Sequence, residues 1–139
     1  MISMIESGKA SPTYRTLEAI SSALTSAGSK SLARDVMTKG VAKAKPYERL
    51  STAVARMRKK GISQMPVVDS GKIVGALRES DIISNSGAAL VKDAMGRKFA
   101  EVPPDAPIGL VRAILSQDDA VIVVRSGRIL GIITKSDII

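Results

Sequence analysis

Apolar residues in the first half of the chain recur at helical spacing between residues 50 and 60. Leu50, Ala53, Val54 and Met57 follow one another at intervals that place them on one side of a helix, and the basic residues between them lie largely on other faces. Gly61 follows directly, and glycine is the usual residue at a helix C-terminus. The pattern predicts an amphipathic helix that ends at Gly61.

The pattern then changes to two short β-rich runs. Met65 to Val68 and Ile73 to Leu77 are separated by the turn sequence Asp-Ser-Gly-Lys at residues 69–72. Two such runs joined by a glycine-containing turn predict a β-hairpin. The second half of the chain repeats this order, with a helix predicted near 108–115, strands at 121–124 and 129–133, and a turn at Ser126 and Gly127.

An internal duplication explains this second occurrence. Residues 66–83 and 122–139 are identical at ten of eighteen positions, which chance does not supply. The offset between these copies is 56 residues, and upstream the match continues at an offset of 58. The second copy is therefore two residues shorter, near residues 116–120. A short Ser-Asn-Ser-Gly joint at 84–87 separates the copies. We expect a helical segment at 1–30, a first repeat at 31–84 and a second at 88–139. Neither repeat buries enough apolar surface alone, so the two should pack on each other.

Composition removes most catalytic chemistry. The chain of 139 residues has no Cys and no His, which excludes thiolate and imidazole metal sites and nucleophiles. The acidic pair Asp118 and Asp119 lies in a predicted loop with no visible partner. We therefore expect no enzyme and no catalytic cofactor. Apolar stretches are far shorter than the roughly 20 residues of a spanning helix, and no signal-like N-terminus is present, so we expect a cytoplasmic protein without a membrane partner.

The net charge of +8 is unevenly distributed, because residues 34–83 carry six of the eight excess positive charges. A local positive field favours a polyanion, either a nucleotide phosphate or a nucleic acid backbone, and a solvated basic helix face is the alternative. With only Tyr14, Tyr47 and Phe99 as aromatic residues, a stacking platform for single strands is poorly supported.

Each repeat combines an Asp-x-Met opening, an amphipathic helix, a hairpin, and then Gly, two apolar residues, Ser or Thr (Arg78 in the first copy), two residues and Asp. The opening reads RDVMT at 34–38 and KDAM at 92–95, and the segments GISQMPVVD (61–69) and GIITKSD (131–137) follow. This order resembles the CBS domain. The resemblance implies an α+β fold of two tandem β-α-β-β-α repeats packed through their sheets, with up to two clefts between them. It also implies a homodimer and an adenosine-containing regulatory ligand, namely AMP, ADP, ATP or S-adenosylmethionine.

In the second repeat, the predicted ligand contacts are Thr134, Lys135 and Asp137. They lie where a strand ends and a helix begins, so that free backbone N–H groups would favour an anion. The Asp137 carboxylate can accept hydrogen bonds from both ribose hydroxyls, while the Thr134 hydroxyl reaches a phosphate or carboxylate oxygen and Lys135 adds charge. Alternatively, Asp137 or Ser136 simply caps the helix.

In the first repeat, Asp81 takes the ribose position, but Arg78 replaces the Ser or Thr of the family pattern. Arg78 either holds a phosphate of a longer ligand or closes this cleft. The resemblance further implies base contacts from upstream stretches, which in the first repeat contain Thr38, Val41, Ser63, Met65 and Pro66. In the second repeat these stretches are 96–100 and 120–122, with Ala120 and Ile122 as the candidates. For Met65 and Ile122, a plain core role is an equal alternative.

Residues 3–24 resemble the second half of a Cro/repressor-type helix-turn-helix domain. Ser11 and Pro12 suit the start of a helix, and Leu17, Ile20 and Leu24 would form its buried stripe. We interpret the segment either as the remnant of a longer regulator or as a helix that packs on the repeats. The leading hypothesis is a nucleotide sensor. The alternative is a transcription regulator or nucleic-acid-binding protein whose DNA-binding part is truncated here, with DNA as partner of a fuller N-terminal domain.

Overall fold

The structure is a computed structural model that describes residues 31–139. The predicted segment at 1–30, with its helix-turn-helix resemblance, lies outside these residues. In chain order the described elements are α2 (Ala33–Val36), α3 (Leu50–Lys60), β1 (Gln64–Asp69), β2 (Lys72–Arg78), α4 (Glu79–Ser84), α5 (Val91–Ala94), β3 (Ala100–Val102), α6 (Ile108–Leu115), β4 (Ala120–Arg125), β5 (Arg128–Thr134) and α7 (Lys135–Ile138).

The predicted helix of the first repeat is α3, and its buried positions are Leu50, Ala53 and Met57. Gly61 ends the helix in the left-handed conformation, at φ 65°, and its N–H donates to carbonyls of the last turn. Glycine enters this region without the steric penalty that a Cβ brings. The corresponding helix of the second repeat, α6, buries one stripe in the same way.

Both predicted hairpins are present, each with a two-residue turn. Ser70 and Gly71 have φ angles of 53° and 80°, and Ser126 and Gly127 have 52° and 77°. Two successive residues with positive φ match the right-handed twist of the flanking strands. β1 pairs antiparallel with β2, and β4 with β5, while β3 adds a parallel strand beside β4. In the first repeat a single parallel bridge from Ala44 to β1 takes the place of β3.

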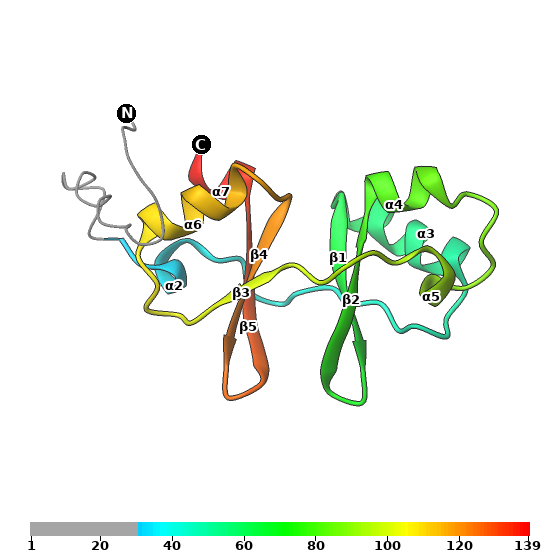
Figure 1. Cartoon of the computed structure of the whole chain (residues 1–139), viewed down its shortest axis with the longest axis horizontal. Coiled ribbons are helices and arrows are strands. Elements are labelled where there is room, and N and C mark those ends of the chain that lie inside the picture. The colour runs from blue at the N-terminus through cyan, green and yellow to red at the C-terminus, as the bar shows by residue number, and fades with distance from the viewer. Residues whose placement is uncertain (1–30) are drawn as a thin grey trace.

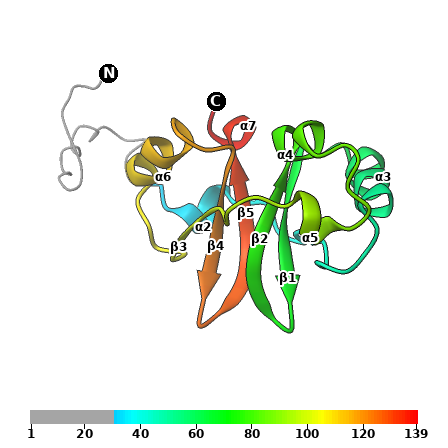
Figure 2. The ribbon, with the colours of Figure 1, turned by 45° about the vertical axis from the view of Figure 1, so that its right-hand side comes forward.

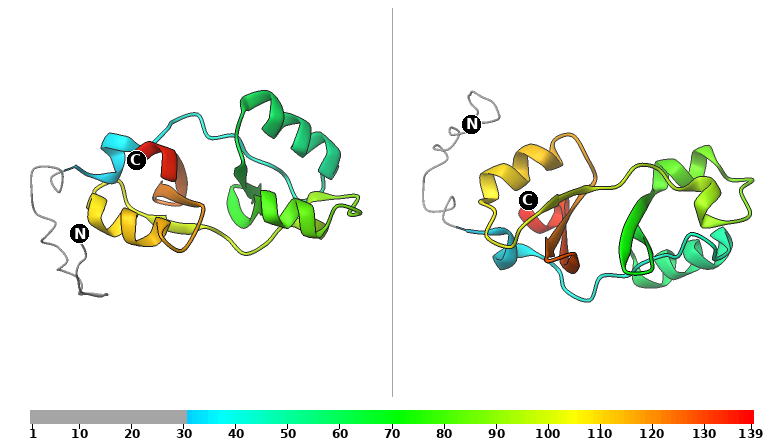
Figure 3. Two further views of the ribbon diagram at one scale, coloured as in Figure 1. Left: turned by 90° about the horizontal axis from the view of Figure 1, so that it is seen from above. Right: turned by 60° about the horizontal axis from the view of Figure 1, so that its bottom comes forward.

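The elements form two lobes (Figure 1). The first lobe contains α3, β1, β2, α4 and α5, and the second contains α2, β3, α6, β4, β5 and α7. The lobes do not coincide with the repeats, because the short leading helix of each repeat packs in the lobe of the other. Ala33 of α2 is buried in the second core, and Val91 and Ala94 of α5 are buried in the first. Figure 3 shows α2 beside α6 and α7, and α5 beside α3 and α4.

The two lobes meet through their sheets. Ala76 on β2 packs with Ala120 and Ile122 on β4 and with Phe99 between α5 and β3, and partly buried apolar residues of β2, β4 and β5 surround them. Figure 2 shows the two hairpins facing one another at this contact. The predicted α+β class of two repeats packed through their sheets is confirmed.

Candidate functional site

Two crossing segments, residues 37–49 and 95–99, join the lobes, and each is hydrogen-bonded to the second strand of a hairpin. The Thr38 N–H donates to the carbonyl of Ile132 at 2.8 Å, and the Ile132 N–H donates back at 3.0 Å. Gly96 and Ala76 form the same pair of bonds, at 2.8 and 3.1 Å. These bonds place Thr38 and Gly96, which follow the two Asp-x-Met openings, beside the Gly-to-Asp motif that ends the opposite repeat.

Thr38 therefore lies next to Asp137 of the second repeat, although it belongs to the first repeat and was predicted to act with the residues of that repeat. The Thr38 hydroxyl donates to Asp137 Oδ1 at 3.4 Å. Asp137 Oδ2 accepts from the Thr134 N–H at 2.8 Å and from its hydroxyl at 3.3 Å. Thr134 Oγ1 and Ser136 Oγ are 3.0 Å apart. We call these four residues, Thr38, Thr134, Ser136 and Asp137, the Asp137 cluster.

Asp137 caps the start of α7, as the alternative interpretation anticipated. Capping uses Oδ2, whereas Oδ1 accepts only the long bond from Thr38 among the groups of residues 31–139. Among residues 31–139, no Lys or Arg nitrogen comes within 4.0 Å of this carboxylate. Asp35 caps α2 through the same type of bond, from the Leu32 N–H at 2.9 Å. Helix capping is therefore not specific to Asp137, because Asp35 does the same. Asp137 differs in having the hydroxyls of Thr38, Thr134 and Ser136 around it.

The Asp81 end is arranged differently, because a buried arginine occupies it. Arg78 is 8% exposed. Its Nε and Nη2 donate to the two carboxylate oxygens of Asp118 at 3.1 and 3.2 Å, and its Nη1 donates to the carbonyl of Arg97 at 2.9 Å. The guanidinium also lies over the Phe99 ring, 4.4 Å from its centre. Asp81 Oδ2 accepts from the Arg78 N–H at 2.9 Å.

The expectation that Asp118 has no partner was wrong. Asp118 binds Arg78, and Asp119 Oδ2 lies 3.9 Å from the same guanidinium. Arg78 and Asp118 lie 40 positions apart along the chain, so no local sequence pattern connects them. The signal in the sequence was indirect: the second repeat is two residues shorter near 116–120, and the acidic pair stands in that shortened loop.

The residues implied as base contacts have different environments. The side chains of Met65, Pro66 and Ile122 are fully buried, and Ala120 is 0% exposed. Met65 belongs to the core of the first lobe, and Ile122 to the contact between the sheets, so their side chains are core. Val41 is partly exposed, and Ser63 and Lys135 are exposed.

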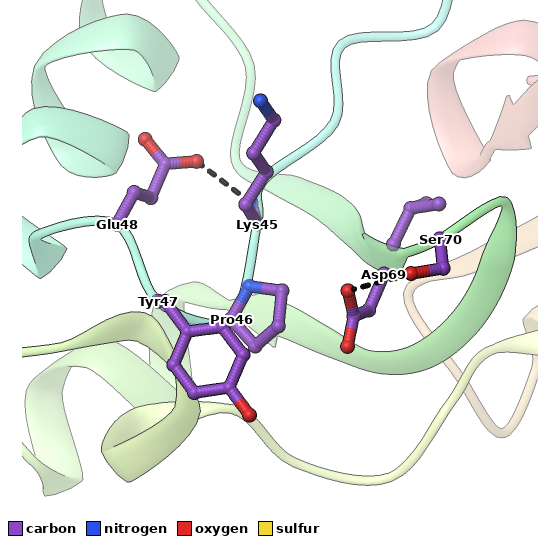
Figure 4. Close-up of a pocket in the computed structure, with 7 residues that line it drawn as sticks. Lys45, Pro46, Tyr47, Glu48, Asp69 and Ser70 are labelled. Atoms are coloured by element: carbon purple, nitrogen blue, oxygen red, sulfur yellow. Dashed lines mark hydrogen bonds between the residues drawn. The ribbon is translucent and has the colours of Figure 1, made fainter.

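The described residues form two surface hollows, and neither is lined by Arg78, Asp81 or Thr134. The larger, of about 470 Å³, is lined by residues 45–48 and 68–70 (Figure 4). Its Glu48 carboxylate accepts from the Lys45 N–H at 2.7 Å and from Arg56 Nη2 at 2.7 Å. Burial acts to raise the pKa of Glu48, but the bonds from Arg56 and Lys45 outweigh it, and the pKa is lowered. The smaller hollow, of about 210 Å³, includes Asp137 together with Arg112 and the chain end.

Neither a metal cluster nor a membrane span is found within residues 31–139. No three acidic side chains in this part of the chain gather where a metal ion could be held. None of its helices has the length and apolar character that a bilayer crossing demands.

Known proteins share the sequence pattern and the fold of this chain. The CBS domain family model matches residues 33–87 and 91–139. An inosine-5′-monophosphate dehydrogenase from Korarchaeum cryptofilum is 30% identical over 109 residues, which are 76% of this chain and 22% of that enzyme. The chain thus spans less than a quarter of that relative.

Solved structures give the same result. The CBS domain pair of protein MJ0100, in complex with 5′-methylthioadenosine and S-adenosyl-L-methionine, has a TM-score of 0.71 at 27% identity and covers 78% of this chain and 96% of its own. CBSX2 in complex with AMP has a TM-score of 0.70 at 20% identity, over 77% of this chain and 92% of its own, a likeness of fold. With two family matches in tandem, the chain belongs to the CBS domain family.

Proposed function

We propose that this chain is a regulatory module that binds an adenosine-containing nucleotide between its two CBS repeats and performs no chemistry on it. The Asp137 cluster carries this proposal. Asp137 Oδ1 lies beside the Thr38 hydroxyl of the other repeat, and a carboxylate oxygen of this kind accepts hydrogen bonds from a ribose diol. A ligand held there would touch both repeats, so its binding would stabilise their packing.

The chemistry of the surrounding groups agrees with such a ligand. The hydroxyls of Thr134 and Ser136 can donate to a phosphate or carboxylate oxygen, and the exposed Lys135 can supply positive charge. The MJ0100 pair was solved with two adenosyl compounds, which makes AMP, ADP, ATP, S-adenosylmethionine and 5′-methylthioadenosine the ligands to test. Which of them binds is decided by groups that read the base and the 5′ substituent.

A thermal-shift panel with these five ligands tests the proposal. A ligand that binds only the folded state at 100 times its Kd adds about 2.7 kcal/mol to the free energy of unfolding, so we expect the melting temperature to rise by several degrees. Asp137→Ala should abolish the rise. Asp35→Ala is the matched control, because it removes an equivalent helix cap and leaves the Asp137 cluster intact. A panel without any shift, or equal shifts in the Asp137→Ala variant, would refute the proposal.

The alternative, a DNA-binding regulator, is motivated by residues 1–30, which lie outside the described residues, and by the basic segment 34–83. It is not favoured, because the family matches cover the CBS repeats and similar CBS structures were solved with adenosyl compounds. The homodimer and the cytoplasmic location stay predictions. Light scattering of the purified chain, with and without nucleotide, measures the first of these directly.

A further inference from the structure

We propose that Arg78 closes the cleft at Asp81, so that the pair of repeats binds its nucleotide at one cleft only, the one formed by the Asp137 cluster. This inference rests on the proposed function, because it concerns how many clefts that function uses. The two ends of the molecule are related by the duplication, and Arg78 stands where the second repeat has Thr134. The difference between these two side chains decides the stoichiometry.

The protein holds the Arg78 guanidinium through all three of its nitrogens. Its side chain is 10% exposed, and each of its three nitrogens already donates, two of them to Asp118 and the third to the Arg97 carbonyl. The Phe99 ring covers one face at 4.4 Å. A phosphate arriving at this position would compete with Asp118 for the guanidinium, exchanging one anionic partner for another. The geometry therefore favours closure over the other possibility, in which Arg78 holds a ligand phosphate.

The carboxylate of Asp81 is also less available than that of Asp137. A Cβ built on Gly96 would lie 2.7 Å from Asp81 Oδ1, so this oxygen is packed against the crossing segment. The other oxygen accepts the Arg78 N–H and lies 3.7 Å from Arg78 Nη1. Asp137 faces a hydroxyl in place of Gly96 and has no ion-pair partner within the described residues. Of the two ends, the Asp137 end offers a ribose an acceptor with no cationic nitrogen from residues 31–139 within 4.0 Å.

The closure should persist because breaking it is unfavourable. The Asp118 side chain is 13% exposed, and a largely buried carboxylate that loses its partner is strongly destabilising. Asp118 comes from the second repeat and Arg78 from the first, so the ion pair also ties the lobes together beside the closed cleft.

Isothermal titration with the nucleotide that gives the largest thermal shift tests the inference. We expect one equivalent per chain for the natural sequence and two for Arg78→Thr, which copies the second repeat. In the Arg78→Thr background, Asp137→Ala or Asp81→Ala should each return the value to one. Arg125→Thr is the matched control, because it replaces an exposed arginine at the end of β4. Arg78→Thr combined with Asp118→Ser avoids leaving a buried carboxylate unpaired if the single variant folds poorly.

The inference would be overturned if the natural chain bound two equivalents of nucleotide. It would also be overturned if Arg78→Thr and Arg78→Thr combined with Asp118→Ser each bound one. Either result would leave the proposed function in place. If no nucleotide binds any variant, the proposed function fails instead. The closure is then measured without ligand, by the rate at which phenylglyoxal modifies each arginine. Arg78 should react at least tenfold more slowly than Arg125, and Asp118→Asn should remove most of that protection. Equal rates at Arg78 and Arg125 in the natural chain would show that the cleft is open.

Discussion

Gly75 and Gly131 lie at equivalent places on β2 and β5, and each faces a methionine from the Asp-x-Met opening of the other repeat. A Cβ built on Gly131 would lie 2.7 Å from both Cγ and Sδ of Met37. A Cβ on Gly75 would lie 2.8 Å from Met95 Sδ and 3.0 Å from the Gly96 carbonyl oxygen. Neither glycine has a positive φ, so backbone conformation does not require glycine here. Glycine is needed because a Cβ would collide with the crossing segment.

We therefore expect Gly131→Ala to lower the free energy of unfolding by about 1–3 kcal/mol, the usual cost of overpacking. Combining it with Met37→Ala should recover part of this loss, which urea unfolding of the double-mutant cycle will measure. Gly75→Ala should be rescued less well by Met95→Ala, because the Gly96 backbone oxygen stays in place.

Gly87→Ala is the control for these substitutions. A Cβ there meets nothing within 4 Å, so its effect should be neutral or slightly stabilising. Similar losses for Gly87→Ala and Gly131→Ala would contradict the packing explanation.

At the scale of elements, α3 is held to the preceding crossing segment by one side chain. Arg56 donates to both carboxylate oxygens of Glu48, at 2.7 and 3.2 Å, and to the carbonyl of Lys43 at 3.0 Å. The bond to Glu48 raises the pKa of Arg56, and the net effect on Glu48 is a lowered pKa. The Arg56 contact fastens the helix at its middle, beyond what its apolar stripe provides.

This ion pair predicts a specific pH dependence. Because the folded pKa of Glu48 lies below its unfolded value, which is about 4.3 for a free glutamate, its contribution to stability is present above that pH and is lost as the pH falls through the folded pKa. Glu48→Gln should therefore be less stable than the natural chain at pH 7 and should lose less stability on acidification to pH 3. Urea midpoints at several pH values measure this.

Glu101→Gln serves as the control for the pH series, because Glu101 is an exposed glutamate on β3. It should follow the pH dependence of the natural chain. A Glu48→Gln curve parallel to the natural one over the whole range would mean that the Glu48 ion pair does not contribute.

At the scale of the whole molecule, the exchange of leading helices makes the two repeats dependent on each other. The second lobe needs Ala33 from the first repeat, and the first lobe needs Val91 and Ala94 from the second. The backbone is exchanged as well: Ala33 N–H donates to the Ala106 carbonyl at 2.8 Å, and Val91 N–H to that of Glu48 at 3.0 Å. Each lobe is thus assembled from both halves of the chain.

Division of the chain directly after the 84–87 joint tests this dependence. We expect fragments 31–87 and 88–139 to lack a cooperative thermal transition separately, because each core would miss a buried helix. Mixed at equal concentration, they should recover helical circular dichroism and a single transition. Independent cooperative unfolding of either fragment would refute the exchange as a requirement for folding.

Much of the local structure was predictable from residues alone. The helix at α3 and the hairpin that follows it are specified by apolar spacing, by Gly61 and by the Ser70-Gly71 turn, all of which act over a few residues. The capping role of Asp137 was likewise anticipated as an alternative. The sequence alone did not decide whether Met65 is a core residue, because an apolar residue after a helix fits a core and a ligand wall equally well. The structure places its side chain in the core of the first lobe.

The chain's own pattern thus determined the duplication, the order of helices and hairpins, and the family. Tertiary structure alone decided that Thr38 lies with Asp137, that Arg78 binds Asp118, and that each leading helix belongs to the other lobe. The physical reason is range: periodicity and turn chemistry report interactions between near neighbours. Contacts between residues 40 or 99 positions apart depend on how the two copies cross in space.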